Sequence, residues 1–175
     1  MKKINTPLTK ENISSLNAGD SILLTGYIYT ARDAAHKELC ALLDRGKPLP
    51  VDFRAETIYF AGPCPAPEGK IIGSCGPTTS CRMDKFSPKL LNYGLLGMIG
   101  KGDRSDEVVE AIKNNGAVYF AAIGGAGALI SQCVKSAEVV AFEHLGTEAI
   151  RRLYVEDMPL IVAIDSSGNN LYRNR

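Results

Sequence analysis

The chain has 175 residues, enough for one domain with a core that folds unaided. Apolar residues make up 45% and charged residues 22%, as in ordinary soluble globular proteins. The formal net charge of +1 argues against a nucleic-acid or membrane-surface partner, which usually needs a basic face or tail. A local cluster of cations is still compatible with this balance.

The amino-terminal stretch and the cysteines indicate the compartment. The opening sequence MKKINTPLTKEN has lysines but no apolar segment behind them, so no signal peptide is predicted. The longest uncharged stretch, residues 116–134, divides better into a strand, a glycine loop and a helix start than into a membrane span. Five cysteines without a regular framework fit a reducing environment. We therefore expect a cytoplasmic protein.

The first half of the chain begins with strand-like patterns. Residues 19–31, GDSILLTGYIYTA, are typical of a β-strand. The following residues carry leucines and alanines at helical spacing, with Asp33 as the expected cap and Gly46 as the expected end. Residues 56–62, ETIYFAG, and residues 70–74, KIIGS, are predicted to be short strands on either side of a proline-rich turn.

Helix and strand patterns alternate in the next part. Residues 87–94, SPKLLNYG, predict a short helix with Ser87 as cap, proline at its start and glycine past its end. Residues 96–100, LGMIG, indicate a buried strand. Residues 104–116, RSDEVVEAIKNNG, predict a helix capped by Ser105, with acidic residues in its first turn.

The last third completes the fold prediction. Residues 117–123, AVYFAAI, indicate a buried strand, and the GGAGA turn at residues 124–128 leads into a helix. Two further segments, residues 138–146 and residues 159–172, complete the chain. Continuous apolar strands alternating with helices predict a mixed α/β fold with a covered sheet. We expect one domain over residues 1–175.

A metal site within this chain is not predicted. Five residues separate Cys75 from Cys81, whereas structural zinc sites usually have two to four residues between paired ligands, twice over. Asp33 and His36 stand one helical turn apart without further ligands nearby in sequence. Cysteines are more often small buried apolar residues.

Two other chemistries have weak signals. The GGAGAL stretch, residues 124–129, follows a strand and opens a helix, as anion-binding loops do. It lacks the dinucleotide spacing and any following Gly-Lys-Ser/Thr, so close packing of helix and sheet is the simpler interpretation. A cysteine–histidine nucleophile can always be drawn from five cysteines and two histidines, and nothing singles one out.

Three cations each follow an apolar strand-like segment beside a turn: Arg32, Arg82 and Lys101. Strand ends and the helix starts after them are where α/β proteins place ligands. Arginines bind carboxylates bidentately, and a lysine supplies a point charge. Thr78 and Thr79 add hydroxyls beside Arg82. The pattern suits a site for a small dianion, and it leaves open that all three are ordinary surface cations.

Three segments together identify a family. Residues 76–105, GPTTSCRMDKFSPKLLNYGLLGMIGKGDRS, closely resemble the central motif of the class I iron–sulfur fumarate hydratases, in the β subunit or the matching C-terminal domain. Residues 25–37, TGYIYTARDAAHK, resemble the family's N-terminal motif, and residues 143–172 resemble its closing segment. The resemblance covers essentially the whole chain in order.

The resemblance implies a swivelling β/β/α domain and an obligate partner, the α subunit, in a hetero-oligomer of the α2β2 type. In this family the α part carries three cysteines that hold a 4Fe–4S cluster, and it also carries the general base. We therefore expect no metal ligand in this chain and no activity without the partner.

The resemblance also assigns roles residue by residue. Arg32, Arg82 and Lys101 match the cations that hold the substrate carboxylates, and Thr78 matches the hydroxyl proposed as proton donor or relay. Position 81 is cysteine where a small residue such as glycine or alanine is expected. This departure puts the local turn geometry in question, and the roles of Cys75 and Cys81 are open.

Several functions remain in competition. L-tartrate dehydratase β subunits share the GPTTS and GKG elements, and mesaconate hydratases belong to the same family. The YTARDAAHK and RMDKFSPKLL sequences resemble fumarases more closely, which favours fumarate hydration. From a different class, a non-catalytic anion-binding module is the alternative, in which the fold is kept and the partner lost.

Overall fold

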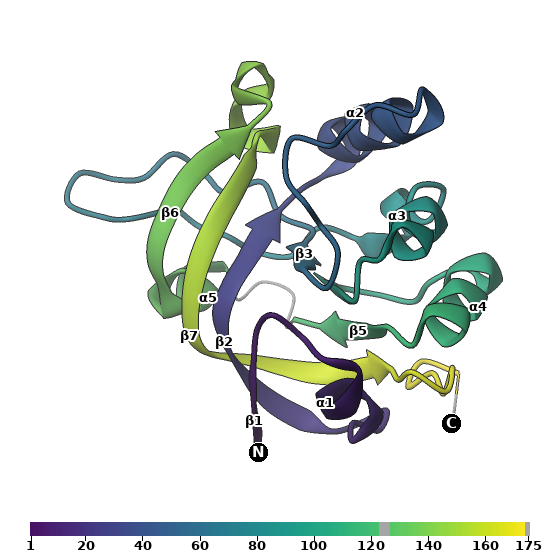
Figure 1. Ribbon diagram of the computed structural model, residues 1–175. Helices are drawn as coiled ribbons and strands as arrows, with labels where there is room; N and C mark the ends of the chain where they lie inside the picture. The colour runs from purple at the N-terminus through teal and green to yellow at the C-terminus, as the bar shows by residue number, and fades with distance from the viewer. Residues whose placement is uncertain (123–126, 174–175) are drawn as a thin grey trace.

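The computed structural model describes residues 1–122 and 127–173, and Figure 1 shows how their helices and strands are arranged. The strands are β1 (Lys2–Asn5), β2 (Ser21–Thr30), β3 (Thr57–Tyr59), β4 (Gly97–Gly100), β5 (Val118–Ala121), β6 (Val134–Ala141) and β7 (Ile150–Ile164). The helices are α1 (Lys10–Ser14), α2 (Asp33–Asp44), α3 (Ser87–Tyr93), α4 (Asp106–Asn115) and α5 (Gly127–Cys133), with 3₁₀ segments η1 (Ser80–Met83) and η2 (Glu143–Glu148). The predicted mixed α/β class is confirmed.

The described strands form one sheet that closes on itself. Their order is β1-β2-β3-β4-β5-β7-β6, and β2 pairs with β7 as well. The neighbours from β2 to β5 run parallel, whereas β7 is antiparallel to both β5 and β2. The pairings therefore form a ring of β2, β3, β4, β5 and β7. In Figure 1, β6 and the first part of β7 curve along the left side, and β7 then turns to end beside β5.

Two hydrophobic cores lie on the two faces of the short parallel strands. Along β3, Tyr59 belongs to a core shared with residues of β2 and β7, while Ile58 and Phe60 belong to a second core. This second core also contains the buried sides of α2, α3 and α4, which stack along one side of the sheet (Figure 1). Because side chains alternate across a strand, even these strands of three or four residues contribute to both cores.

The predicted strand at residues 70–74 is wrong. This segment has no regular structure and belongs to a long loop between β3 and η1. The loop folds on itself, and the Cys64 N–H donates to the Ser74 carbonyl at 2.9 Å. A Cβ on Gly73 would lie 2.4 Å from the Cys64 carbonyl oxygen, so only glycine permits this approach. The apolar run anchors the loop, with Ile72 in the first core.

Two predicted helix caps are also wrong. Asp33 is the first residue of α2, and the N-cap residue of this helix makes no capping hydrogen bond with its side chain. The Asp33 carboxylate instead binds Arg82. Ser87 lies inside α3 and accepts a hydrogen bond from Arg104 at 2.7 Å. The Ser105 cap of α4 is confirmed. Side chains that the sequence assigned to helix ends therefore make contacts between elements.

Strand β1 and helix α1 were not predicted from the sequence; α1 begins with a capping box at Thr9. The predicted glycine-rich turn falls largely on residues 123–126, which lie outside the described residues. Among residues 1–122 and 127–173, no helix is both long enough and apolar enough to span a membrane.

Candidate active site

The carboxyl ends of β2, β3 and β4 meet at one edge of the sheet (Figure 1). Hydrogen bonds continue beyond the strands. The Thr78 N–H donates to the Phe60 carbonyl at 2.7 Å, and the Ser80 N–H donates to the Lys101 carbonyl at 2.9 Å. Because neighbouring strands are ~4.8 Å apart, the backbone segments bearing Arg32, Thr78 and Lys101 lie side by side at this edge.

Arg32 follows β2 and lies over the backbone of Gly62. A Cβ on Gly62 would lie 2.9 Å from Arg32 Cδ and 3.0 Å from Nη1. The glycine therefore makes room for the guanidinium. Arg32 Nε is buried and has no hydrogen-bond partner among the described residues. A buried donor without an acceptor costs about 1–3 kcal/mol, so an acceptor placed beside this N–H would be stabilising.

Arg82 comes from the 3₁₀ segment η1 and is tied to α2. Its Nη2 lies 2.8 Å from Asp33 Oδ2, and its Nε donates to the same oxygen at 3.0 Å. The Arg82 side chain is 49% exposed, so Nη1 remains available to a ligand. The ion pair places Arg82 beside the start of α2. Arg32 is the residue directly before this helix.

Thr78 and Lys101 lie on adjacent segments. Residue Thr79 forms an isolated parallel bridge with Lys101. A Cβ on Gly100 would lie 1.9 Å from Ser80 Oγ, so the glycine before Lys101 lets this loop pack directly on β4. In the described part of the chain, the Thr78 hydroxyl makes no hydrogen bond and Lys101 makes no ion pair. The geometry therefore brings all four predicted site residues to one edge of the sheet.

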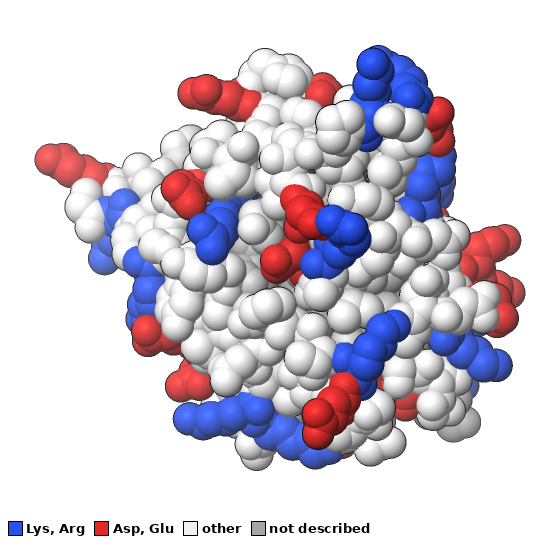
Figure 2. Space-filling model, in the orientation of Figure 1, with Lys and Arg blue, Asp and Glu red and all other residues white. Residues whose placement is uncertain are grey.

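Arg82 has a carboxylate partner, whereas Arg32 and Lys101, like surface lysines such as Lys37 and Lys85, have none among the described residues. On the face shown in Figure 2, basic and acidic side chains are interspersed and form no continuous basic patch. Several other exposed cations have carboxylate partners, as in the Lys2–Asp20 and Arg54–Asp52 pairs. Two unpaired cations near one another favour the binding of an anion.

A buried arginine supports this edge from beneath. The side chain of Arg104 is 0% exposed, and its Nε lies 2.6 Å from Asp84 Oδ1. The guanidinium lies over the rings of Phe60 and Tyr119, at 5.2 Å and 4.8 Å from their centroids. Asp84 also accepts from the Ser105 N–H at 2.8 Å. The network ties η1, which carries Arg82, to the loop that carries Lys101.

His36 stabilises the start of α2 as a neutral side chain. Its Nδ1 lies 2.8 Å from the Arg32 carbonyl oxygen, which can only accept, so Nδ1 carries the proton. Burial between Phe60 and Phe86 lowers the pKa of His36 to about 4, and the nearby Arg104 adds to this effect. The imidazole is therefore uncharged at neutral pH and holds the Arg32 backbone in place.

The cysteines do not fit a 4Fe–4S cluster. Within residues 1–122 and 127–173, no three His, Cys, Asp or Glu side chains are grouped so that they could hold a metal ion. Burial raises the pKa of Cys75 to about 12, so this thiol is protonated at neutral pH in the core that surrounds it. Cys75 is part of the first core, and Cys81 is exposed beside Arg82.

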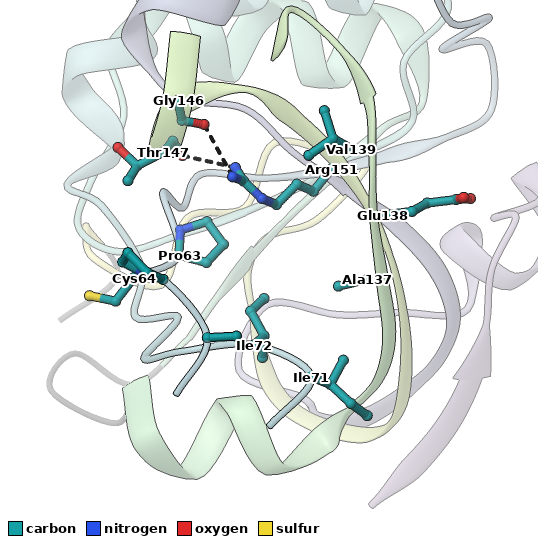
Figure 3. Close-up of a pocket in the computed structure, with 12 residues that line it drawn as sticks. Pro63, Cys64, Ile71, Ile72, Ala137, Glu138, Val139, Gly146, Thr147 and Arg151 are labelled. Carbon is teal, nitrogen blue, oxygen red and sulfur yellow. Dashed lines mark hydrogen bonds between the residues drawn. The ribbon is translucent and has the colours of Figure 1, made fainter. Parts of the chain in front are cut away.

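A groove of about 380 Å³ lies between the loop after β3 and strand β6. Thr147 lines the groove, and its carbonyl would lie 3.2 Å from a Cβ on Gly62. Figure 3 shows Arg151 reaching across to the carbonyls of Gly146 and Thr147, at 3.1 Å and 3.2 Å. Arg151 therefore holds the η2 turn in place.

Sequence reasoning missed the supporting residues. Arg104 was taken only as the first residue of a predicted helix, and Asp33 only as a cap. No signal in one sequence tells a buried arginine from an exposed one, because its partner Asp84 lies 20 positions away. The RMD and GKGDRS elements do contain the two partners, so their pairing was the available hint.

Fold and site define an α/β domain that presents three cations and a hydroxyl at the carboxyl ends of neighbouring parallel strands. A family model described as Fumarase C-terminus matches residues 2–175, and the chain belongs to this family. The family resemblance read from the motifs is confirmed.

Individual relatives differ in length. The anaerobic class I fumarate hydratase of Escherichia coli is 39% identical over 175 residues, covering 99% of this chain and 31% of that protein. Fumarate hydratase 2 of Leishmania major is 36% identical over 165 residues, covering 93% and 29%. A putative L(+)-tartrate dehydratase subunit beta of Methanocaldococcus jannaschii is 39% identical over 171 residues, covering 94% and 88%. The chain therefore spans about a third of these fumarate hydratases and most of the tartrate dehydratase subunit.

Proposed function

We propose that this chain is the β subunit of an iron–sulfur hydro-lyase that hydrates fumarate reversibly to L-malate. The observation that supports the proposal is that Arg32, Arg82 and Lys101 come from segments at one sheet edge, where Arg32 Nε and the Lys101 ammonium have no acceptor among the described residues. Fumarate is a dianion with a carboxylate at each end, and guanidinium groups match carboxylates bidentately.

The chain's own residues supply binding and charge stabilisation. Addition of water across the double bond passes through an aci-carboxylate whose extra negative charge lies on a carboxylate. Fixed cations aimed at that carboxylate stabilise the transition state more than the substrate. Thr78 is proposed to relay a proton at the reacting carbon. A threonine hydroxyl is a weak acid, so this role needs a partner-chain carboxylate nearby.

The remaining machinery is proposed to lie on a partner α subunit. The described cysteines do not fit a 4Fe–4S cluster, so the cluster belongs to that subunit in this proposal. The general base is assigned to the same subunit. The isolated chain is then inactive, and activity belongs to a hetero-oligomer, which we propose is of the α2β2 type and works in the cytoplasm.

L-Tartrate is the second candidate substrate. The observation that favours it is the match to a tartrate dehydratase subunit beta over 88% of that protein's length, whereas the fumarate hydratases are about three times longer. Mesaconate hydration needs the same cations and is the third candidate. A stand-alone anion-binding module would keep the cations and need no partner.

The test is to co-express the chain with its α subunit and assay the complex anaerobically on fumarate, L-tartrate and mesaconate. We expect fumarate hydration to be the fastest reaction. Tartrate turnover well above fumarate hydration would reassign the substrate. Purification without a partner, together with anion binding and no turnover, would support the non-catalytic module.

The same complex tests the cations. We expect Arg82→Ala to lower kcat/KM by a factor of ~10²–10³, equivalent to ~3–4 kcal/mol, as for the loss of one oxyanion donor. Arg54→Ala is the matched control, because Arg54 is also an exposed arginine paired with an aspartate but precedes β3. Near-normal turnover of Arg82→Ala would refute the assigned role.

A further inference from the structure

Lys101 is followed by a residue that packing does not fix. Gly102 has φ of +86°, in the left-handed region that favours glycine. A Cβ at this position would meet nothing within 4 Å. The direction in which the chain leaves Lys101 therefore depends on hydrogen bonds to the Gly102 peptide groups.

Two tyrosines from different elements make these hydrogen bonds. The Tyr119 hydroxyl, on β5, donates to the Gly102 carbonyl at 2.8 Å, and Ser80 Oγ lies 2.8 Å from the same hydroxyl. A phenol has one proton and a carbonyl only accepts, so Ser80 is the donor to Tyr119. The Gly102 N–H donates to the Tyr172 hydroxyl at 3.1 Å.

Tyr172 is itself held in position by its neighbours. Asn170 is 4% exposed, its Oδ1 accepts from the Tyr172 N–H at 3.0 Å, and its Nδ2 donates to Asp103 at 2.9 Å. Arg173 donates to the Arg104 carbonyl at 2.6 Å. Residues 170–173 therefore lie along residues 102–104 and present the Tyr172 hydroxyl to the loop that carries Lys101.

We propose that Tyr172 is a positioning residue for Lys101. Its hydroxyl fixes the N–H of Gly102 while Tyr119 fixes the carbonyl, and together they set the path of the Lys101 backbone at the sheet edge. This inference rests on the proposed function, because it assumes that Lys101 binds a substrate carboxylate. It adds the 165–173 segment, which supplies no predicted site residue, to the support of the site.

The experiment is a double-mutant cycle in the co-expressed complex, read by fumarate kinetics and by calorimetric binding of succinate, a dicarboxylate without a double bond. Tyr172→Phe removes one oxygen, and we expect kcat/KM and succinate affinity to fall about three- to tenfold, as for one lost hydrogen bond. In a Lys101→Gln background, the same substitution is expected to have no further effect.

Two controls make the result specific. Tyr154→Phe removes a tyrosine hydroxyl that makes no hydrogen bond within the described residues, and we expect parental kinetics. In an Arg32→Ala background, Tyr172→Phe is expected to keep its full effect, because Arg32 follows a different strand. Thermal unfolding of each complex identifies any variant that has lost its fold, and succinate binding is still measurable where turnover is too low.

The outcomes separate the two proposals. An equal loss from Tyr172→Phe in the parent and in the Lys101→Gln background shows a general structural role and overturns the inference alone. Parental kinetics for Tyr172→Phe also overturns it. Parental kinetics and succinate binding for Lys101→Gln overturn the role of Lys101 in the proposed function, and the inference with it.

Discussion

Arginines occur both at the sheet edge and in the layer directly beneath it, and they differ in how their donors are used. Arg82 at the edge has a side chain that is 49% exposed, and Arg32 beside it has a buried Nε without a partner among the described residues. Arg104 below is 0% exposed, and its three guanidinium nitrogens contact Asp84, Met98 and Ser87. Hydrogen-bond donors without a partner in the protein suit ligand binding, whereas donors that are bonded within the protein suit a structural role.

The arginines at the sheet edge, Arg32 and Arg82, and the arginine in the layer beneath it, Arg104, therefore have different roles. A side chain with filled donors adds to the fold, and its loss leaves partners buried without a counterpart. A side chain with open donors adds little to the fold and can give its hydrogen bonds to a substrate. Substitutions in the lower layer should therefore change stability first, and substitutions at the edge should change activity first.

The largest stability effect is expected for Arg104→Met. It leaves the Asp84 carboxylate, which is 14% exposed, without its cation, and breaking a buried pair in this way costs about 3–5 kcal/mol of unfolding free energy. Denaturant unfolding measures it. The double variant Arg104→Met/Asp84→Asn removes the stranded charge and should recover part of the loss. If Arg104→Met were as stable as the parent, the proposed structural role of Arg104 would be contradicted.

The contrast between the layers also explains what the sequence could predict. The strands and helices around Arg32 and Lys101 follow from apolar runs and from glycine and proline punctuation, which are local. The caps at Asp33 and Ser87 failed because their side chains bind Arg82 and Arg104, contacts made across the fold. Local propensity cannot anticipate a partner that tertiary structure supplies.

The site residues and the loop show the same limit. Arg32, Arg82 and Lys101 were predicted as site residues from their places after strand-like segments and from the family motif, and they follow segments at one edge of the sheet. The KIIGS run was predicted as a strand from composition alone, because no local rule shows that Gly73 lies against the Cys64 carbonyl. The role of Tyr172 was equally hidden, since its contact to Gly102 spans 70 positions.

A smaller effect, set by pH, is expected at His36. Its pKa in the folded chain is about 4, against an ordinary value of 6.5. Between these values the unfolded chain binds a proton that the folded chain does not, so stability is lost as the pH falls from 6.5 towards 4. The shift corresponds to roughly 3 kcal/mol. Asp33 opposes it and Arg104 adds to it, after burial as the main cause.

Unfolding free energies measured from pH 7 to pH 4 test this effect. His36→Asn keeps an amide donor for the Arg32 carbonyl but cannot titrate, so its stability should fall less steeply than the parent's. Identical slopes for the parent and His36→Asn would contradict the burial of a neutral imidazole beneath the edge.

The smallest effect is expected for Asp33→Asn, and it tests whether the edge arginine is prepared by its neighbour. The Asp33–Arg82 pair is partly exposed, so its loss should change stability by less than about 1 kcal/mol. Arg82 then loses the carboxylate that orients its Nε and Nη2, and we expect KM for fumarate in the complex to rise a few-fold with kcat nearly constant. Asp52→Asn breaks the exposed Arg54 pair before β3 and should leave KM unchanged. A fall in KM for Asp33→Asn would mean that Asp33 competes with the substrate carboxylate for Arg82, so that the edge would be blocked by this ion pair and not prepared by it.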